Sequence, residues 1–520
     1  MHTFNRYPAL ILIAPVGYLF WAHWPIITGQ FLSDTFSHIY NCYDWSQNQQ
    51  LGQKLAALFL RSINEEGGAD MYRPLGIASY CLDYMLWGVE PYYHKITQLL
   101  FHIFNGLLFF VLVQKVTDYY KFTSHFALIA TALYLLSPLS PEVSSWVATR
   151  FDVLVQTFML LALYSAWCYR RVWTLLFLVF ALLSKESAIV IIPMLVSLSW
   201  FRQSREFSNR IIQTLKDSWL YIALLLVYLL FRLFVFGQAT DVYVKDLSLF
   251  DRFIGNALQF PTTLQKLAFG PFHGSLLSIL FMSLVAVLIL LSLWHCMRTK
   301  TLNIWFFIFS SVSLVLLALI TQFSSTDKSG GGARVLYILI PWLCGLVSLP
   351  ILSRTGVTYK IVLVCFFITS LIFHNRIIKQ WNDGAQLSAL IMQNVPAVAV
   401  DISEDDWTLL LIPEHLGAAL LGRNAQGGYV LPPFQNNRYL DSIVPFIWSD
   451  LELWRNRINE GFVVTFKENS MSPNPSPKQV FCIQKNGTFV GFPITYNELK
   501  SSPNWLSFWR NAIKSKGCYQ

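Results

Sequence analysis

Long apolar runs dominate the first 374 residues and predict a membrane architecture. An α-helix needs about 20 mostly apolar residues to cross a bilayer, and runs of about that length recur along this part of the chain. We predict about eleven transmembrane helices, near residues 8–27, 94–114, 123–139, 151–168, 172–184, 187–201, 218–236, 274–296, 302–322, 335–352 and 358–374. The fifth and sixth are short and separated only by Ser184–Ser187, so this polar turn is expected at a membrane face.

The two long loops, 28–92 and 237–273, carry amphipathic stretches. Apolar residues share one helical face in each, at Leu51, Leu55, Leu58, Phe59 and Ile63, and at Leu247, Phe250, Phe253, Ile254, Ala257 and Leu258. Such stretches predict helices that lie in the plane of the membrane interface.

The tail from residue 375 has a different pattern. Short β-rich runs are divided by Gly, Pro and Asn turns, at Trp407–Ile412, Phe462–Phe466, Val480–Ile483 and Thr488–Phe492. The tail therefore predicts a small α/β or mixed domain outside the membrane, over residues 375–520, after a transmembrane domain over residues 1–374.

Composition supports this division. The chain of 520 residues is 54% apolar and 13% charged, against roughly 45 to 50% and 25% in soluble domains, which excludes a soluble globular protein. Lys and Arg gather in the short loops of one face, which predicts a cytoplasmic N-terminus. The long loops and the tail then face the periplasm or a lumen, and the first span, which lacks a small-residue cleavage site, is expected to be retained.

The eight cysteines divide under this topology. Cys42, Cys81, Cys482 and Cys518 are expected on the oxidising side. The spacing allows a disulfide between Cys482 and Cys518 but does not determine the pairing.

Ionisable side chains near the spans are candidates for function because a charge in hydrocarbon costs about 2.5 to 3.5 kcal/mol on insertion scales. Asp34 follows the first span directly. It is either part of a solvated loop or a general base at the membrane surface.

A polar stripe opens the second span. His94, Gln98, His102 and Asn105 fall within about 80 degrees of one another at 100 degrees per residue, so they share one helical face. The stripe either bonds to neighbouring helices or lines a cleft for a polar or phosphorylated headgroup.

Two further places concentrate charge at the outer face. Glu142, Arg150 and Asp152 lie between the third and fourth spans, either as an ion-pair knot or as a site for a sugar or phosphate, with Arg150 as a bidentate phosphate donor. Lys185–Glu186 and Arg334 form the other. Their cations either snorkel to the interface or bind an anion.

The order of these positions resembles one known superfamily. The matching elements are Ser33–Asp34, Tyr72–Leu75, Leu86–Gly88, Tyr93–His94, His102, Asn105, Ser137–Pro138, Glu142, Trp146, Arg150, Asp152, Ser184–Glu186, Arg334–Tyr337 and Pro341. Together they resemble the C-type (GT-C) glycosyltransferases, and within them the protein O-mannosyltransferase-like branch that includes the transmembrane and tetratricopeptide-repeat mannosyltransferases. The resemblance covers most of residues 30–341.

The resemblance implies an inverting sugar transfer from a polyprenyl-phosphate donor at the extracytoplasmic face, with Asp34 as the general base. It implies donor-phosphate binding by Arg334, Lys185, Arg150, His94 and His102. It implies sugar or acceptor binding, or an orienting role, for Glu142, Asp152, Arg73, Gln98, Asn105, Glu186 and Tyr337. Among these, Glu142 and Asp152 would hold sugar hydroxyls or orient Arg150. A phosphate leaving group needs no proton if cations receive its charge.

This sequence departs from the family pattern at two acidic positions, where it has Thr35 and Ala333. With Thr35 in place of a carboxylate we expect no metal and no certain cofactor. The repeat domain is absent, so the family's acceptor class does not carry over, and the acceptor is left as an unspecified glycan, lipid or protein.

Other function classes stay open at this point. A transporter or flippase of lipid-linked saccharides predicts inverted repeats and ionisable residues at the bilayer midplane. A polysaccharide polymerase or ligase differs in donor size, and a scaffold would not need Asp34. No nucleic-acid partner is expected, and a bacterial inner membrane is the expected location, with the site facing the periplasm.

Overall fold

The computed structural model describes most of the helical part and portions of the tail. The described residues are 11–60, 72–119, 125–202, 207–236, 274–299, 332–352, 357–400, 408–422, 426–436, 443–447, 479–484, 489–493 and 514–518. The chain divides into two compact units. The first contains Met1–Trp24, Gln49–Leu82 and Lys95–Lys379, and the second contains Pro25–Asn48, Asp83–His94 and Gln380–Gln520.

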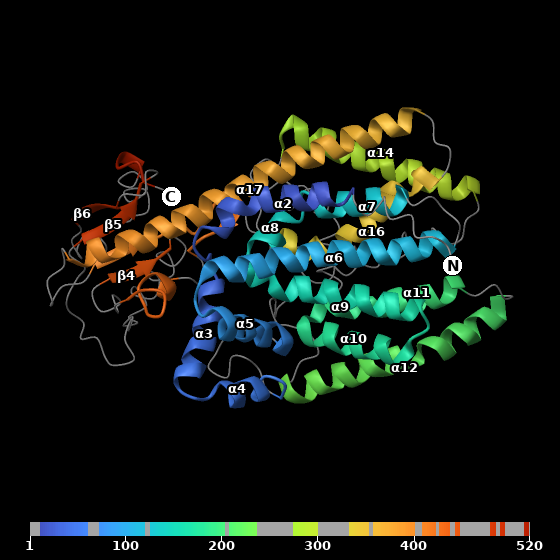
Figure 1. The fold of residues 1–520 in the computed structure, drawn as a ribbon, viewed down its shortest axis with the longest axis horizontal. Helices are drawn as coiled ribbons and strands as arrows, with labels where there is room; N and C mark the ends of the chain where they lie inside the picture. The colour runs from blue at the N-terminus through green and yellow to red at the C-terminus, as the bar shows by residue number, and fades with distance from the viewer. Residues whose placement is uncertain are drawn as a thin grey trace, which may run out of the picture. The chain divides into compact units, whose positions relative to one another are not determined.

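Helices make up the described part of the first unit (Figure 1). Those that lie wholly or mainly in it are α2 (Ile13–Ile27), α4 (Leu51–Ala57), α5 (Pro74–Trp87), α6 (Pro91–Tyr119), α7 (His125–Leu135), α8 (Pro141–Ser145), η1 (Val147–Thr149), α9 (Arg150–Trp167), α10 (Arg171–Ser184), η2 (Glu186–Val190), α11 (Ile191–Arg202), α12 (Phe207–Phe236), α14 (Leu276–Thr299), η6 (Ala333–Leu339), α16 (Ile340–Ser348) and η7 (Leu349–Leu352). Helix α17 (Val357–Val400) begins in this unit and continues into the second.

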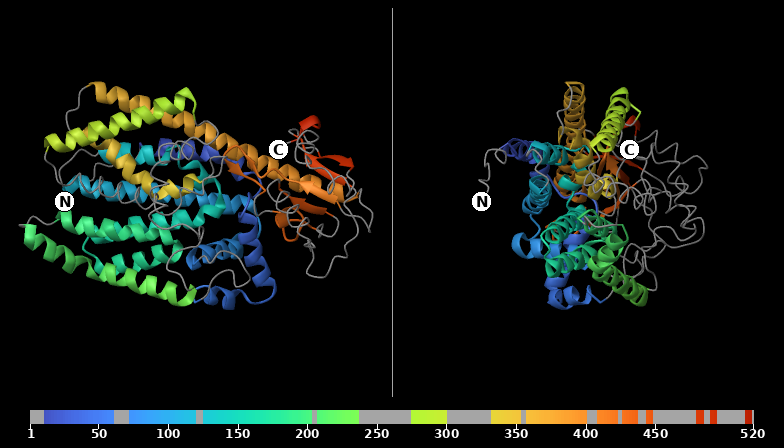
Figure 2. Two further views of the ribbon diagram at one scale, coloured as in Figure 1. Left: turned by 180° about the vertical axis from the view of Figure 1, so that it is seen from behind. Right: turned by 90° about the vertical axis from the view of Figure 1, so that its right-hand side faces the viewer.

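Burial separates central helices from peripheral ones. In the most apolar stretch of Val147–Trp167, 83% of the residues are buried inside the protein, whereas the same measure is only 22% for Asn209–Val235. On α12, Leu226, Leu230 and Phe234 are exposed and four residues apart, so they form one apolar face. Such a face is stable in lipid and would be costly in water. Figures 1 and 2 show α9, α10 and α12 side by side.

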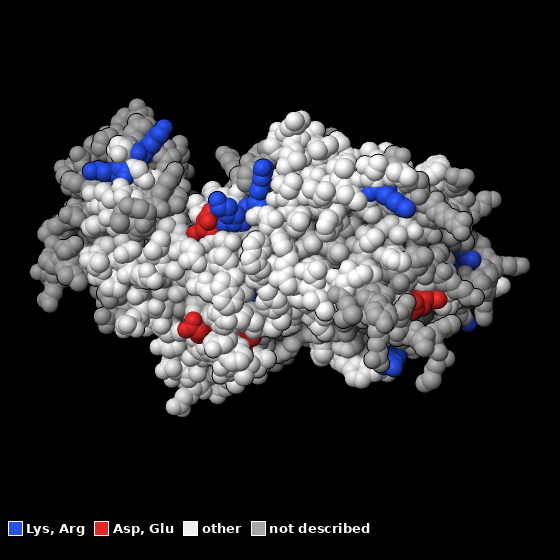
Figure 3. All heavy atoms as spheres, turned by 45° about the horizontal axis from the view of Figure 1, so that its top comes forward, with Lys and Arg blue, Asp and Glu red and all other residues white. Residues whose placement is uncertain are grey.

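Five described helices are long and apolar enough to cross a membrane, and five shorter apolar helices accompany them. On the face in Figure 3, Lys, Arg, Asp and Glu side chains are sparse among uncharged ones. The chain is therefore an integral membrane protein. Each predicted span that falls on described residues overlaps one of these helices, although α17 continues 26 residues beyond the predicted end at 374, and the span over 302–322 lies outside the described residues. The count of eleven and the orientation stay predictions.

The second unit contains α3 (Thr35–Gln47), η8 (Gln426–Tyr429) and two small sheets. Their strands are β1 (Thr408–Leu411), β2 (His415–Leu416), β3 (Ala419–Leu420), β4 (Ile443–Phe446), β5 (Gln479–Ile483) and β6 (Phe489–Pro493). The larger sheet has the order β4-β1-β5-β6. Strand β1 is parallel to β4 and β5, with Leu409 opposite Val444 and Val480, and β5 is antiparallel to β6.

Three of the predicted β-runs coincide with strands β1, β5 and β6, whereas β4 was not anticipated and the run Phe462–Phe466 lies outside the described residues. The larger sheet contains both parallel and antiparallel pairs. The α/β or mixed domain outside the membrane stays a prediction. The predicted domain boundary after residue 374 falls inside α17, which is continuous there, and it stays a prediction. Of the two amphipathic stretches, the first begins in α4, and residues 247–258 are not among the described ones.

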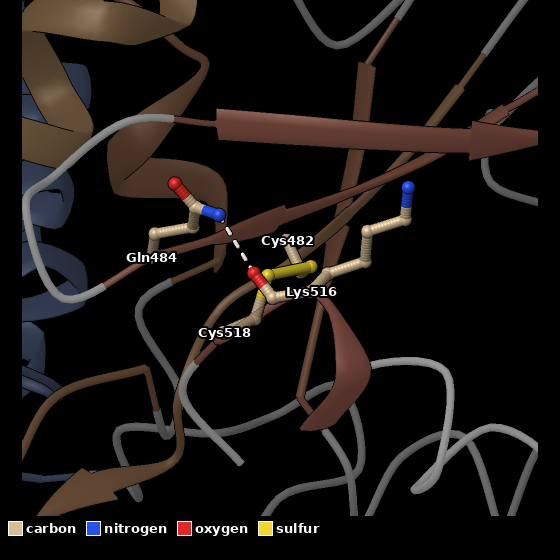
Figure 4. The surroundings of a disulfide bond; sticks show 4 residues. All are labelled: Cys482, Gln484, Lys516 and Cys518. Carbon is tan, nitrogen blue, oxygen red and sulfur yellow. Dashed lines mark hydrogen bonds between the residues drawn. A yellow bond between two sulfur atoms is a disulfide. The ribbon is translucent and has the colours of Figure 1, made fainter.

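A disulfide joins Cys482 to Cys518 across 36 residues (Figure 4). Beside it, the side-chain amide of Gln484 donates to the Lys516 carbonyl oxygen over 2.6 Å, and Gln484 pairs with Cys518 in an antiparallel bridge. Cys42 and Cys81 are also disulfide-bonded. The pairing that the sequence allowed for Cys482 and Cys518 is therefore formed.

We expect this disulfide in the mature protein. Peptide mapping without reductant should recover residues 482 and 518 in one linked fragment that separates on reduction. Because the bridge restricts the unfolded chain, replacing both cysteines by serine should lower the free energy of unfolding by about 2 to 4 kcal/mol. Free thiols at both positions in protein from an oxidising compartment would contradict the pairing.

Helix α5 approaches α9 closely because Gly76 has no side chain. A Cβ at Gly76 would lie 2.0 Å from a ring carbon of Phe151. We expect Gly76→Ala to lower the free energy of unfolding by about 1 to 3 kcal/mol, through displacement of this buried ring. Apparent melting temperatures of the purified protein in detergent measure the effect.

Gly52→Ala is the matched control, since Gly52 is also helical and a Cβ there meets nothing within 4 Å. Alanine is the better helix former, so this variant should be unchanged or more stable. Equal melting temperatures for the two variants would show that the close packing of Gly76 against Phe151 does not contribute to stability.

Candidate functional site

The first turn of α9 and the link between α10 and α11 are joined by a buried ion pair. Lys185 Nζ lies 2.7 Å from Asp152 Oδ1, and the two side chains are only 7% and 5% exposed. Lys185 follows the last residue of α10, in extended backbone. Because an unpaired charge is very costly away from water, this contact fixes the link against α9.

The next residue, Glu186, pairs with Arg73. The guanidinium donates twice, from Nε to Oε2 over 3.1 Å and from Nη2 to Oε1 over 2.7 Å. It also lies over the ring of Phe151, 5.3 Å from the centroid. Burial alone would raise the pKa of the Glu186 carboxyl, but Arg73 and Lys185 outweigh it and hold that pKa well below its ordinary value. Glu186 is therefore ionised at neutral pH.

A third pair joins α8 to the start of η6. The Glu142 carboxylate accepts from the Arg334 side chain over 2.7 Å and from the backbone N–H groups of Gly332 and Arg334 over 3.0 and 3.2 Å. The Arg334 guanidinium lies over the ring of Trp146, 5.0 Å from the centroid. One carboxylate thus holds both the backbone and the side chain of this segment.

Arg150 is fully buried at the start of α9. Its Nε donates to Gln98 Oε1 over 2.8 Å, and its guanidinium lies 5.7 Å and 5.2 Å from the ring centroids of Tyr80 and Phe101. The amide nitrogen of Gln98 donates in turn to the Val143 carbonyl oxygen over 2.7 Å. Gln98 therefore connects α6 with both ends of the α8 to α9 segment.

The lower part of the polar stripe forms a buried network around Tyr337. Its hydroxyl lies 2.9 Å from His102 Nδ1, 2.5 Å from the Tyr134 hydroxyl and 3.5 Å from the Asn105 amide nitrogen. His102 Nε2 faces the Leu135 carbonyl oxygen at 3.2 Å. A carbonyl only accepts, so His102 Nε2 carries a proton and donates it to the Leu135 carbonyl oxygen.

This network engages both ring nitrogens of His102. Asn105 also donates to the Val153 carbonyl oxygen and accepts from the Thr157 hydroxyl. The arrangement favours the first alternative for this part of the stripe, in which polar groups bond to neighbouring helices. Roles of His102, Asn105 and Tyr337 in binding a substrate stay predictions.

Asp34 and His94 belong to the second unit. Asp34 precedes the first residue of α3, and its carbonyl oxygen accepts from the His38 N–H. Ser33 before it has a φ of 49° and donates its N–H to the Leu421 carbonyl oxygen over 3.0 Å. The backbone at Asp34 is thus held from both sides.

His94 is buried and bonded within the second unit. Its Nε2 lies 2.9 Å from the Gly88 carbonyl oxygen, and its Nδ1 lies 3.7 Å from Asp83 Oδ2. The ring of Phe31 packs edge-on against it. Asp83 was not among the predicted site residues, because the sequence around a single acidic residue in an apolar helix does not indicate which residue it pairs with.

We define the α9 charge cluster as the seven charged residues that meet around the start of α9 in the first unit. They are Arg73, Glu142, Arg150, Asp152, Lys185, Glu186 and Arg334. All seven were predicted, but the pairing was not. Tyr134 and Trp146 were not assigned roles, although they contact Tyr337 and Arg334.

A metal centre was not expected. Within the described ranges, no three His, Cys, Asp or Glu side chains gather in a way that could hold a metal ion. Carboxylates of the α9 charge cluster face cations instead. The independence from metal stays a prediction.

Comparison with known proteins gives two similar structures. No protein-family model matches the sequence, and no curated protein matches it. Crystal structures of ArnT from Cupriavidus metallidurans, bound to undecaprenyl phosphate and in the apo state, are similar with TM-scores of 0.40 and 12% identity. The matches cover 80% of this chain and 84% of the bound form, and 86% and 91% for the apo form. The O-mannosyltransferase-like branch stays a prediction.

We expect Asp152→Asn to destabilise the protein by about 3 to 5 kcal/mol, because it leaves the Lys185 ammonium buried without its counter-charge. The double variant Asp152→Asn/Lys185→Met, which removes both charges, should recover at least half of the loss. Melting temperatures in detergent measure both variants. Asp118→Asn, at an exposed position of α6, is the control and should change little. Equal losses in the single and double variants would contradict the ion-pair explanation.

Proposed function

We propose that the chain is a membrane glycosyltransferase that moves a sugar from a polyprenyl-phosphate donor to an acceptor hydroxyl at the extracytoplasmic face. The observation that carries this proposal is the α9 charge cluster, which places four cations and three carboxylates in an apolar helical unit. Ionisable residues inside a membrane protein are expensive to maintain and usually mark a functional site.

The cluster suits an anionic leaving group. When the bond between the sugar and the phosphate breaks, negative charge develops on the departing phosphate oxygen. Cations already held in place stabilise this charge without first reorganising. Arg73, Lys185 and Arg334 are each held by a carboxylate, and Arg150 by Gln98. In this proposal Asp152 and Glu186 keep Lys185 and Arg73 in position.

The acceptor hydroxyl must lose its proton to a base. We assign this role to Asp34, which takes that proton as the acceptor oxygen bonds to the anomeric carbon and the bond from that carbon to the phosphate breaks, with inversion of configuration. Gln98 would keep Arg150 oriented through the hydrogen bond described above. The expected location is a bacterial inner membrane with the site facing the periplasm.

The test is sugar transfer in membranes that carry the parent protein, Asp34→Asn or the control Asp118→Asn at matched expression. Each is given a panel of radiolabelled polyprenyl-phosphate sugars. The parent and the control should release label from one donor. Because a general base contributes about 10²- to 10⁴-fold, Asp34→Asn should be at least about 100-fold slower.

The panel also identifies the sugar, since only the correct donor loses its label. If the parent released label from no donor, the proposed transfer of a single sugar would be wrong. The alternatives would then be a transporter or a transferase that uses a larger lipid-linked glycan. Equal rates for Asp34→Asn and the parent would leave a transferase without Asp34 as its base.

A further inference from the structure

The cations of the α9 charge cluster differ in exposure. The Arg334 side chain is 31% exposed, whereas those of Arg73 and Lys185 are 9% and 7% exposed and Arg150 is fully buried. A group that meets an incoming anion must be accessible to it. Arg334 is therefore the cation of this cluster best placed to make the first contact.

Glu142 determines where Arg334 is held. Its own side chain is only 5% exposed. Glu142 lies in the short helix α8. Its carboxylate accepts three hydrogen bonds from Gly332 and Arg334, at the start of η6. A carboxylate has roughly four acceptor positions, so most of its capacity is used on this segment.

The backbone of the segment is shaped for this contact. Gly332 has a φ of 120°, a conformation that residues with a side chain rarely adopt. Its N–H reaches Glu142 Oε2 over 3.0 Å, and the N–H of Arg334 reaches the same oxygen. The ring of Trp146, the residue after α8, packs against the Arg334 guanidinium, which lies over it.

We propose that Glu142 is a positioning residue that fixes the start of η6 and presents the Arg334 guanidinium to the phosphate of the donor. The inference rests on the proposed function for the identity of the anion. It replaces the roles expected from sequence for Glu142, which were to hold sugar hydroxyls or to orient Arg150. Glu142 acts through Arg334.

The first experiment does not depend on activity. Trypsin must bind the Arg334 side chain and an extended backbone around it, and both are engaged by Glu142 in the parent. In Glu142→Gln, cleavage after Arg334 should be about tenfold faster or more, because hydrogen bonds to a charged group are lost and the segment opens more often. Mass spectrometry of the purified full-length protein in detergent measures the cut.

Asp118→Asn is the matched control, an acid-to-amide change at an exposed position, and should be cut after Arg334 at the parent rate. If Glu142→Gln does not yield folded protein, Glu142→Asp takes its place. It keeps the charge on a shorter side chain and should give an intermediate rate. Parent-like cleavage in a folded variant would overturn the proposal.

The second experiment is a double-mutant cycle on kcat/KM with the donor that the radiolabel panel identifies. If Glu142 acts through Arg334, the variant Glu142→Gln/Arg334→Gln should match Arg334→Gln alone within about twofold. If Glu142 binds sugar itself, the two losses should multiply, and the proposal would be wrong.

The two experiments fail separately. Faster cleavage in Glu142→Gln with no donor turned over by the parent would support the positioning of Arg334 and remove the glycosyltransferase function. If the parent turned over a donor, but Glu142→Gln was cleaved at the parent rate and the losses of kcat/KM in the two single variants multiplied in the double variant, the glycosyltransferase function would stand. The role proposed for Glu142 would then be wrong.

Discussion

The buried ion pair between Lys185 and Asp152 is the contact on which the α9 charge cluster depends. Neither charge is stable in an apolar surrounding without the other. Their pairing brings the link after α10 to the first turn of α9. Glu186, the next residue, then meets Arg73, and Arg150, two residues before Asp152, meets Gln98. One pair thus organises residues that are far apart along the chain.

This organisation has a consequence for chemistry. In the proposed function, cations held by carboxylates and by packed aromatic rings would be oriented before a substrate arrives, so little reorganisation would be needed when negative charge develops. Arg73 lies over Phe151 and Arg334 over Trp146, and each also bonds to a carboxylate. Arg334 is the most exposed of the four cations, whereas the other three are buried.

The polar stripe of α6 illustrates a limit of sequence patterns. Its four residues share a face as predicted, yet they have separate surroundings. His94 bonds within the second unit, Gln98 orients Arg150, and His102 and Asn105 belong to the network around Tyr337. Helical periodicity predicts which side chains share a face, but it does not say which neighbouring helix supplies their partners.

The sequence by itself determined the membrane character, the approximate positions of most described apolar helices and the charged residues that form the α9 charge cluster. It could do so because apolar runs of bilayer length and charges at their ends are properties of consecutive residues. Only the tertiary structure decided that Glu142 pairs with Arg334, across 192 positions. Such a pairing depends on which elements pack together, and many distant packings are compatible with one hydrophobic pattern.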